Sequence, residues 1–114
     1  MMRDDAYLLD IVIAARKAMQ FIEGMTWAEF DGSELHQVAV IRPLEIIGEA
    51  AGRVSAETKR SHPKIPWQQM IGMRNRLIHE YFRIDLEAVW HTVHKDLPEL
   101  IALIEPMIPP ESDA

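Results

Sequence analysis

Apolar residues recur at steps of three and four in the first part of the chain, which is the spacing of one helix face. In residues 5–23 this pattern predicts an amphipathic helix. Asp4 or Asp5 is expected to cap its start, and Gly24 is expected to end it. The apolar face consists of Tyr7, Leu8, Ile11, Ala15, Ala18, Phe21 and Ile22.

A second helical pattern follows. Asp31–Glu34 has the spacing of a capping box with Asp as the capping residue, and the pattern extends to about residue 58. Its apolar positions alternate steps of four and three, which predicts a seam that packs against another helix. The seam consists of Val40, Leu44, Ile47, Ala51 and Val54.

The last third of the chain predicts two more helices. Residues 61–66 are typical of a loop, and Pro66 suits the first position of a helix that continues to about Tyr81. Asp85 is expected to cap a final helix that bends at Pro98. The apolar face of that helix contains Leu86, Val89, Trp90, Val93, Leu97, Leu100, Ile101 and Ile104.

These patterns predict an all-α fold, a four- to five-helix up-down bundle. No alternating strand pattern and no internal repeat interrupts them. We expect residues 1–114 to form one domain, with a flexible tail from about residue 106 to residue 114. A small bundle with a long apolar seam favours a homodimer.

The composition narrows the class of protein. The 114 residues are 48% hydrophobic and 26% charged, as in an ordinary globular domain, and they include no cysteine. No apolar run approaches the ~20 residues of a membrane span, and the two early acids do not fit a secretory signal. We therefore expect a cytoplasmic protein with no membrane association. The net charge of −6 predicts that any nucleic-acid site is a local basic patch or is shared between subunits.

One segment breaks the apolar pattern. On an ideal helix, Arg74 falls in the middle of the apolar stripe of residues 70–81, where a guanidinium needs a partner. One interpretation makes Arg74 a structural ion-pair partner of Glu45 or Glu49 on the second helix. The other makes it a phosphate-binding residue in a cleft, because its fork of donors matches phosphate oxygens.

His79 adds a group that exchanges protons near neutral pH. Asn75 lies four residues earlier on the same helix face, where it can orient the imidazole or hold a substrate. Arg74 and His79 are about 140° apart around a regular helix, so a single helix does not aim both at one atom. The helix can deform near His79, long side chains can reach round it, or two copies of the chain can each bring a segment. Two copies facing each other are the simplest answer, and they also gather Arg76 and Arg83 into the same basic patch.

Tyr81 completes the segment and has two interpretations. It is either a core ring with an outward hydroxyl or an exposed phenol beside a phosphate site. In the second case, a phosphate-bearing group attached to the phenol would repel RNA phosphate and block the site.

The residues Arg74-Asn-Arg-Leu-Ile-His79-Glu-Tyr81 resemble the Arg-x4-His-x-Tyr motif of HepT toxins in the HEPN superfamily. The segment Arg42–Ala50 resembles the second-helix segment of the same family, and the helix order agrees over essentially the whole chain. The resemblance implies an all-α bundle of HEPN type that forms a homodimer.

The resemblance also implies an activity. It is metal-independent cleavage of RNA, with no cofactor, at a composite site in the dimer interface. Arg74 and His79 would be catalytic, with Asn75, Arg76 and Tyr81 in support. The implied biological role is a toxin–antitoxin system. Its antitoxin is a MntA-type nucleotidyltransferase that transfers AMP from ATP to Tyr81, giving O-AMP-tyrosine, and so silences the toxin.

Other features have simpler explanations. His91 and His94 share a face of the last helix, but no third ligand accompanies them, so we expect no metal site. Trp27, Trp67 and Trp90 are expected in the core or in an interface rather than stacked on bases. The alternative function is a non-catalytic helical binding module that pairs with a nucleotidyltransferase or binds a nucleotide.

Overall fold

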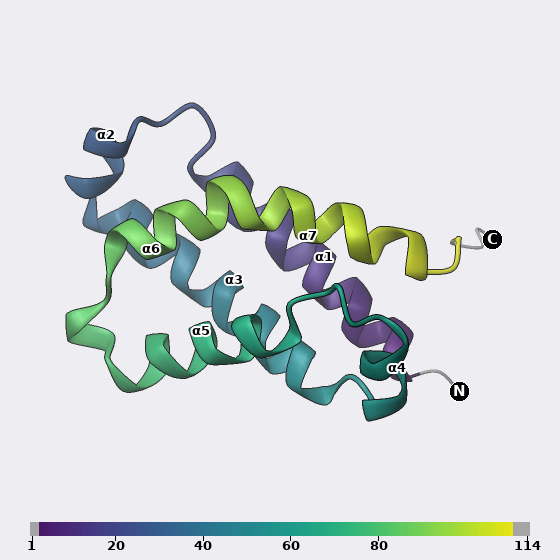
Figure 1. Cartoon of the computed structure of the whole chain (residues 1–114). Coiled ribbons are helices and arrows are strands. Elements are labelled where there is room, and N and C mark those ends of the chain that lie inside the picture. Colours follow the sequence, from purple (N-terminus) through teal and green to yellow (C-terminus); the bar gives the residue numbers. More distant parts are fainter. Residues whose placement is uncertain (1–2, 111–114) are drawn as a thin grey trace.

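Helices account for most of the chain in the computed structural model, which describes residues 3–110 (Figure 1). The α-helices are α1 (Arg3–Phe21), α2 (Trp27–Asp31), α3 (Glu34–Arg53), α4 (Ala56–Ser61), α5 (Trp67–His79), α6 (Leu86–His91) and α7 (Leu97–Ile104). A π-helical turn, η2 (Thr92–Asp96), joins α6 to α7, and 3₁₀ turns occupy η1 (Tyr81–Arg83) and η3 (Glu105–Met107). No strand occurs in residues 3–110, so the predicted all-α class is confirmed.

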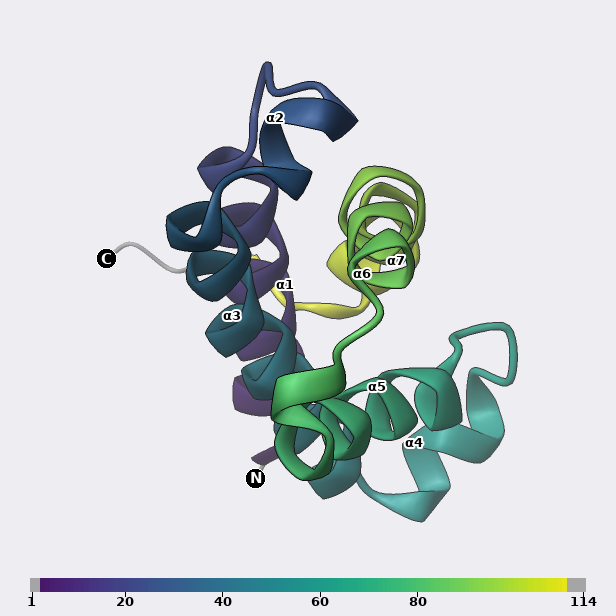
Figure 2. The ribbon, with the colours of Figure 1, turned by 90° about the vertical axis from the view of Figure 1, so that its left-hand side faces the viewer.

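The long helices run up and down (Figure 1). α3 packs against α1 on one side and against α5 on another. The segment α6–η2–α7 forms one extended helix that packs on α1. Helices α4 and α5 project away from this extended helix (Figure 2). This arrangement is the predicted bundle, with the short helices α2 and α4 added at its ends.

The core lies where α1, α3 and the α6–α7 segment meet. All five residues of the predicted α3 seam are buried: Val40, Leu44, Ile47, Ala51 and Val54. From α1 the buried residues include Leu8, Ile11, Ala15 and Ala18. Phe21 is exposed, contrary to the prediction, because α1 ends there and Ile22 fills the core position instead. No helix in the described range is long and apolar enough to cross a membrane.

The ends of the first helix differ from the prediction. α1 covers Arg3–Phe21 rather than residues 5–23, and Gly24 adopts a φ of 81° in the turn that follows. Asp4 lies inside the first turn of α1 and accepts hydrogen bonds from Thr58 Oγ1 (2.6 Å) and from the hydroxyl (2.7 Å) and N–H (3.0 Å) of Ser55. Bonds from Thr58 and then Ser55 lower the pKa of Asp4. Asp4 therefore holds the start of α4 against α1.

The capping box predicted at Asp31–Glu34 is wrong. Asp31 is the last residue of α2, and Ser33 caps α3 by accepting from the N–H of His36 at 3.3 Å. The capping box lies instead at Thr26 and Glu29, at the start of α2. The four residues after Phe30 therefore end one helix before they begin the next.

The long helix expected to reach residue 58 ends at Arg53. Val54 is extended (φ −66°, ψ 141°) and still buried, and Ser55 caps α4 by accepting from the N–H of Thr58. The hydroxyl of Ser55 serves as this cap and also donates to Asp4, so the chain turns at this point.

The final helix has the predicted cap. Asp85 accepts from the N–H of Ala88 at 3.1 Å. At the position where Pro98 predicts a bend, the helix widens into η2, where the N–H of Leu97 bonds to the carbonyl of Thr92. Pro98 has no N–H and its ring crowds the preceding turn, which accounts for the wider turn just before it.

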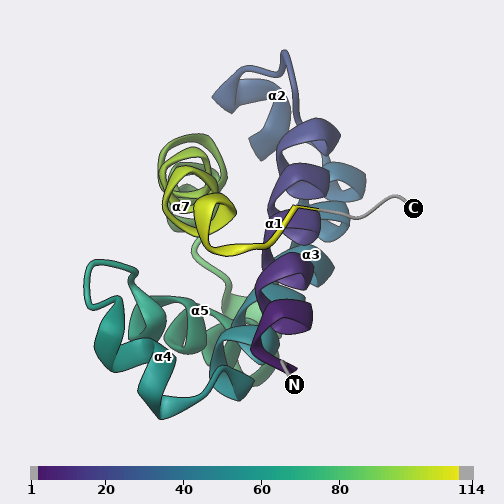
Figure 3. The same cartoon turned by 90° about the vertical axis from the view of Figure 1, so that its right-hand side faces the viewer.

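Two residues in the described part of the predicted tail contact the core. Met107 and Ile108 lie half-buried against the core, and η3 contacts α1 (Figure 3). Arg16 of α1 forms an ion pair with Glu105 at the start of η3. Residues 111–114 of the predicted tail lie outside the described residues.

Candidate functional site

Arg74 lies where α5 crosses α3. A Cβ atom built on Gly48 would stand 2.1 Å from Arg74 Cβ and 2.7 Å from the carbonyl oxygen of Met70. Such distances are far below van der Waals contact, so only glycine at position 48 allows this approach. The stem of Arg74 is therefore packed against the bare backbone of α3.

The guanidinium of Arg74 reaches out of this crossing. Its Nη2 stands 3.7 Å from Glu49 Oε2, and its Nη1 donates to Asn75 Oδ1 at 3.1 Å. Nε is buried and has no hydrogen-bond partner within residues 3–110. Of the two predicted partners, Glu49 lies beside Arg74, whereas Glu45 pairs with Arg42 at 3.3 Å.

His79 is the last residue of α5, and its side chain is exposed. Among the described residues, no hydrogen bond or ion pair joins it to Arg74 or to any other side chain. The structure thus brings Arg74 and Asn75 together and leaves His79 separate, as expected for residues five apart on a regular helix.

The helix predicted to reach Tyr81 ends two residues earlier. Glu80 leaves the helical region (φ −121°, ψ 40°), and Tyr81 begins the 3₁₀ turn η1. Tyr81 is 46% exposed rather than part of a buried stripe. Of the predicted stripe, Met70 and Leu77 are buried, whereas Ile78 is exposed.

Phe82 is a residue that the sequence patterns do not single out. Its ring is 95% exposed and packs edge-on against Tyr81, with the ring centres 5.2 Å apart. An open pocket of about 350 Å³ is lined by residues 78–83, which include His79, Tyr81 and Arg83. The sequence feature that could have indicated this surface is the aromatic pair Tyr81-Phe82 between His79 and Arg83. The pair follows Leu77, the last buried residue of the helix.

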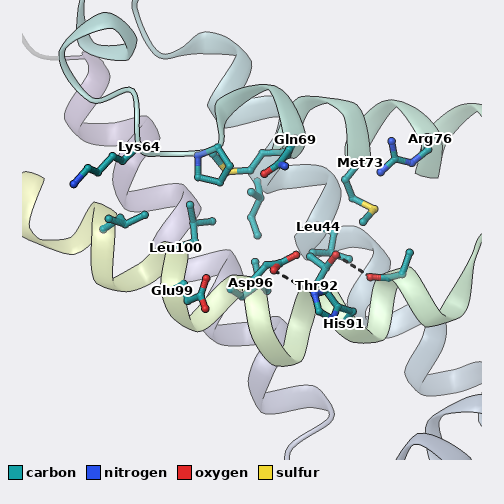
Figure 4. A pocket seen from close by; sticks show the side chains of 16 residues that line it. Leu44, Lys64, Gln69, Met73, Arg76, His91, Thr92, Asp96, Glu99 and Leu100 are labelled. Atoms are coloured by element: carbon teal, nitrogen blue, oxygen red, sulfur yellow. Dashed lines mark hydrogen bonds and ion pairs between the residues drawn. The ribbon is translucent and has the colours of Figure 1, made fainter.

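Arg76 points to a different place. It lines a groove of about 680 Å³ between α5 and the α6–α7 segment, with Lys64 at the far end of the same wall (Figure 4). Asp96 and Glu99 line the same groove from the α6–α7 segment, and Leu44 of α3 lines it between the two walls. Arg76 is therefore not beside Arg74 within one chain.

The two histidines of the last helix contact different neighbours. His91 Nε2 stands 3.6 Å from Asp96 Oδ1, because the π-helical turn brings residues five apart onto one side. His94 stacks on Trp90, with ring centres 3.8 Å apart. No group of three ligating side chains occurs in the described range.

The tryptophans are packing residues, as predicted. Trp67 is buried, and its Nε1 donates to the carbonyl of His62 at 3.1 Å. Trp27 and Trp90 pack together with Phe30 where α2 meets α6.

Comparison with known proteins identifies the family of the chain. The sequence model of the HepT-like family, described as "Ribonuclease HepT-like", matches residues 11–107. The "Probable ribonuclease HepT" of Thermococcus cleftensis is 44% identical over 94 residues, which cover 82% of this chain and 86% of that protein. The "Putative RNase MJ1380" of Methanocaldococcus jannaschii is 38% identical over 100 residues, 88% of this chain and 92% of that protein.

No solved structure matches the chain. The family model covers the crossing of α3 with α5, the exposed end of α5 and the core helices that hold them. The chain belongs to the HepT-like ribonuclease family.

Proposed function

We propose that this chain is a metal-independent endoribonuclease that acts as the toxin of a toxin–antitoxin system. The observation that carries the proposal is the end of α5. It presents a guanidinium held at the helix crossing, an imidazole with no partner among residues 3–110 and an exposed phenol, all within eight residues of the chain. These are the groups that phosphodiester cleavage without a metal requires: a phosphate binder, a proton carrier and a contact for substrate.

The proposed reaction is attack by a ribose 2′-oxygen on the adjacent phosphorus. The bond from phosphorus to the 5′-oxygen breaks, leaving a 2′,3′-cyclic phosphate and a free 5′-hydroxyl. His79 exchanges a proton with the 2′-hydroxyl or with the departing oxygen. Arg74 binds the non-bridging phosphate oxygens and stabilises the added charge of the transition state, and Asn75 and Arg76 assist in holding RNA.

We propose that the active form is a homodimer. Ile78, Tyr81 and Phe82 form an exposed apolar surface at the end of α5, and such a surface favours burial against a partner. Two copies that meet at this surface would place His79 of one copy near Arg74 of the other. The two groups could then act on one phosphate, although they lie apart within one chain. The pairing would also gather the arginines into a basic site on an acidic protein.

Tyr81 is the proposed control point. An antitoxin of the MntA-type nucleotidyltransferase class would join the phenol oxygen to the α-phosphorus of ATP and release pyrophosphate. The exposure of Tyr81 supports access to an enzyme of this kind. The added phosphate would repel RNA from the adjacent His79 and Arg83. We also propose that the protein acts in the cytoplasm, because RNA and ATP are both present there.

The test is cleavage of defined RNAs by purified protein in the presence of a chelator. Wild type should cleave, and His79→Ala should lose about 10²–10⁴-fold in rate while it stays folded. Cleavage that a chelator abolishes would contradict metal independence. Wild type that binds a nucleotidyltransferase but never cuts RNA would favour a non-catalytic binding module.

The control point has a separate test. Wild type is incubated with the nucleotidyltransferase and ATP, and the added mass of AMP is located by peptide mass spectrometry. Tyr81→Phe should take up no AMP, and incubation with the antitoxin and ATP should not lower the cleavage rate that this variant has on its own. Modification at another residue would contradict the assignment.

A further inference from the structure

The crossing of α3 with α5 fixes the root of the Arg74 side chain. Gly48 leaves no room for a Cβ, because that atom would lie 2.1 Å from Arg74 Cβ and 2.9 Å from its Cγ. The first carbons of Arg74 are therefore confined by the α3 backbone. A side chain confined at its root loses less entropy when its far end binds a ligand.

The far end of Arg74 is held from two sides. Asn75 Oδ1 accepts from Nη1 at 3.1 Å, and Glu49 Oε2 lies 3.7 Å from Nη2. A guanidinium has five N–H donors in one plane. The buried Nε contributes none of them to solvent, so only the hydrogens on Nη1 and Nη2 are available to an RNA phosphate.

We propose that Gly48 and Glu49 are positioning residues for Arg74. Gly48 sets the point from which the side chain leaves the helix pair, and Glu49 sets the direction in which the plane of the guanidinium faces. The proposal rests on the proposed function, because it assigns the orientation of the group that binds the scissile phosphate.

The ion pair is suited to exchange with a phosphate. The side chains of Arg74 and Glu49 are 32% and 41% exposed, and at 3.7 Å the pair is longer than a good hydrogen bond. RNA can therefore take a free Nη hydrogen without breaking a strong contact. The carboxylate also repels RNA phosphate, so Glu49 is expected to improve turnover at some cost in affinity.

Glu45 provides a matched control. It lies one turn before Glu49 on α3 and has the same side chain, but it pairs with Arg42 and not with Arg74. Glu49→Ala should lower kcat about tenfold, since a displaced catalytic group commonly loses that much or more. Glu49→Gln keeps the size of the side chain but removes its charge, so kcat should fall as in Glu49→Ala, with a lower KM for RNA, because a contact of 3.7 Å is electrostatic rather than a hydrogen bond. Glu45→Ala should leave kcat within about twofold.

A second measurement does not depend on cleavage. In protein with ¹⁵N-labelled arginine, rotation of the Arg74 guanidinium about its Nε–Cζ bond is measured by NMR, with Arg74→Lys used to assign the signals. Rotation should be slow in wild type, faster in Glu49→Ala and unchanged in Glu45→Ala. Gly48→Ala is informative only if it folds, and the Glu49 variants test the proposal independently of it.

The two failures are distinguishable. If wild type cuts no RNA but Glu49→Ala still frees the guanidinium, the positioning role stands and the proposed function fails. If wild type cuts RNA and Glu49→Ala changes neither kcat nor the rotation, the positioning role is wrong. A fall in kcat without faster rotation would also overturn it, because Glu49 would then act by another route.

Discussion

Helix α3 has two long neighbours, and they contact it in different ways. Against α1 it makes an apolar interface in which Ile11, Ala15 and Val40 are fully buried. Against α5 it makes an interface that contains Gly48 and a half-buried arginine with an unsatisfied Nε. An unpaired buried donor costs about 1–3 kcal/mol, so the α5 side is less stable than an apolar side chain would make it.

The difference separates two roles of one helix. The α1 side stabilises the fold. The α5 side is less stable because it contains Arg74, whose charged group reaches the surface there. Natural proteins depart from good packing mainly at functional positions. Variants on the two sides should therefore separate stability from activity.

The largest effect on stability is expected on the α1 side. Ile11→Ala removes a fully buried side chain and should lower the free energy of unfolding by about 2–5 kcal/mol. Urea denaturation followed by circular dichroism measures this loss. Cleavage per folded molecule should match that of wild type, and a specific loss of activity would blur the distinction between the two sides.

A smaller change in stability is expected when the two glycines of α3, Gly48 and Gly52, are replaced by alanine. Gly48→Ala must push α5 away and should cost about 1–3 kcal/mol, because overpacking forces the backbone to shift. Gly52→Ala meets no atom within 4 Å and should stabilise the helix by up to about 1 kcal/mol. Thermal melts of the two variants give opposite signs if the close crossing is real. Equal shifts in Tm would contradict it.

Arg74→Met sharpens the comparison further. It removes the unsatisfied Nε, keeps a long apolar stem and loses only the partly exposed pair with Glu49, so the variant should be at least as stable as wild type. RNA cleavage should nevertheless be lost. A large loss of stability in the denaturation curve would mean that Arg74 is a structural residue after all.

The smallest effect lies away from both interfaces. Bonds from Thr58 and Ser55 lower the pKa of Asp4, so its ionised form stabilises the fold. This contribution is complete above the ordinary pKa of about 3.9 and is lost as the pH falls through the lowered value. Asp4→Asn should therefore lower Tm slightly at pH 7, and the difference from wild type should shrink as the pH falls below about 3.9. Asp10→Asn, on the same helix and exposed, should show no such convergence.

Local chemistry predicted the apolar seam of α3 and the cap at Asp85, because both depend on spacing within a few residues. Arg74 stood out for the same reason, since a charge within an apolar stripe needs an explanation. The role of Asp4 could not be predicted, because its partner Ser55 lies 51 positions away in the sequence. The choice of Glu49 over Glu45 depends on where α5 crosses α3, which no periodicity reports.

The end of α5 was missed for a different reason. No glycine or proline lies between His79 and Asp85, so the pattern alone extended the helix to Tyr81. The exposure of Phe82 follows from the 3₁₀ turn that replaces the last helical residues. Phe82 could not be predicted as an exposed neighbour of the motif, because its exposure requires the helix to end at His79 and not at Tyr81.

Phe82 has a practical consequence for anyone who handles the protein. A chain with a net charge of −6 repels its copies at low ionic strength, whereas a fully exposed ring draws them together. Salt screens the repulsion over a Debye length of about 8 Å at physiological strength and leaves the apolar attraction intact. Salt weakens binding to RNA phosphates at the same time. Self-association and affinity for RNA should thus change in opposite directions along a salt titration.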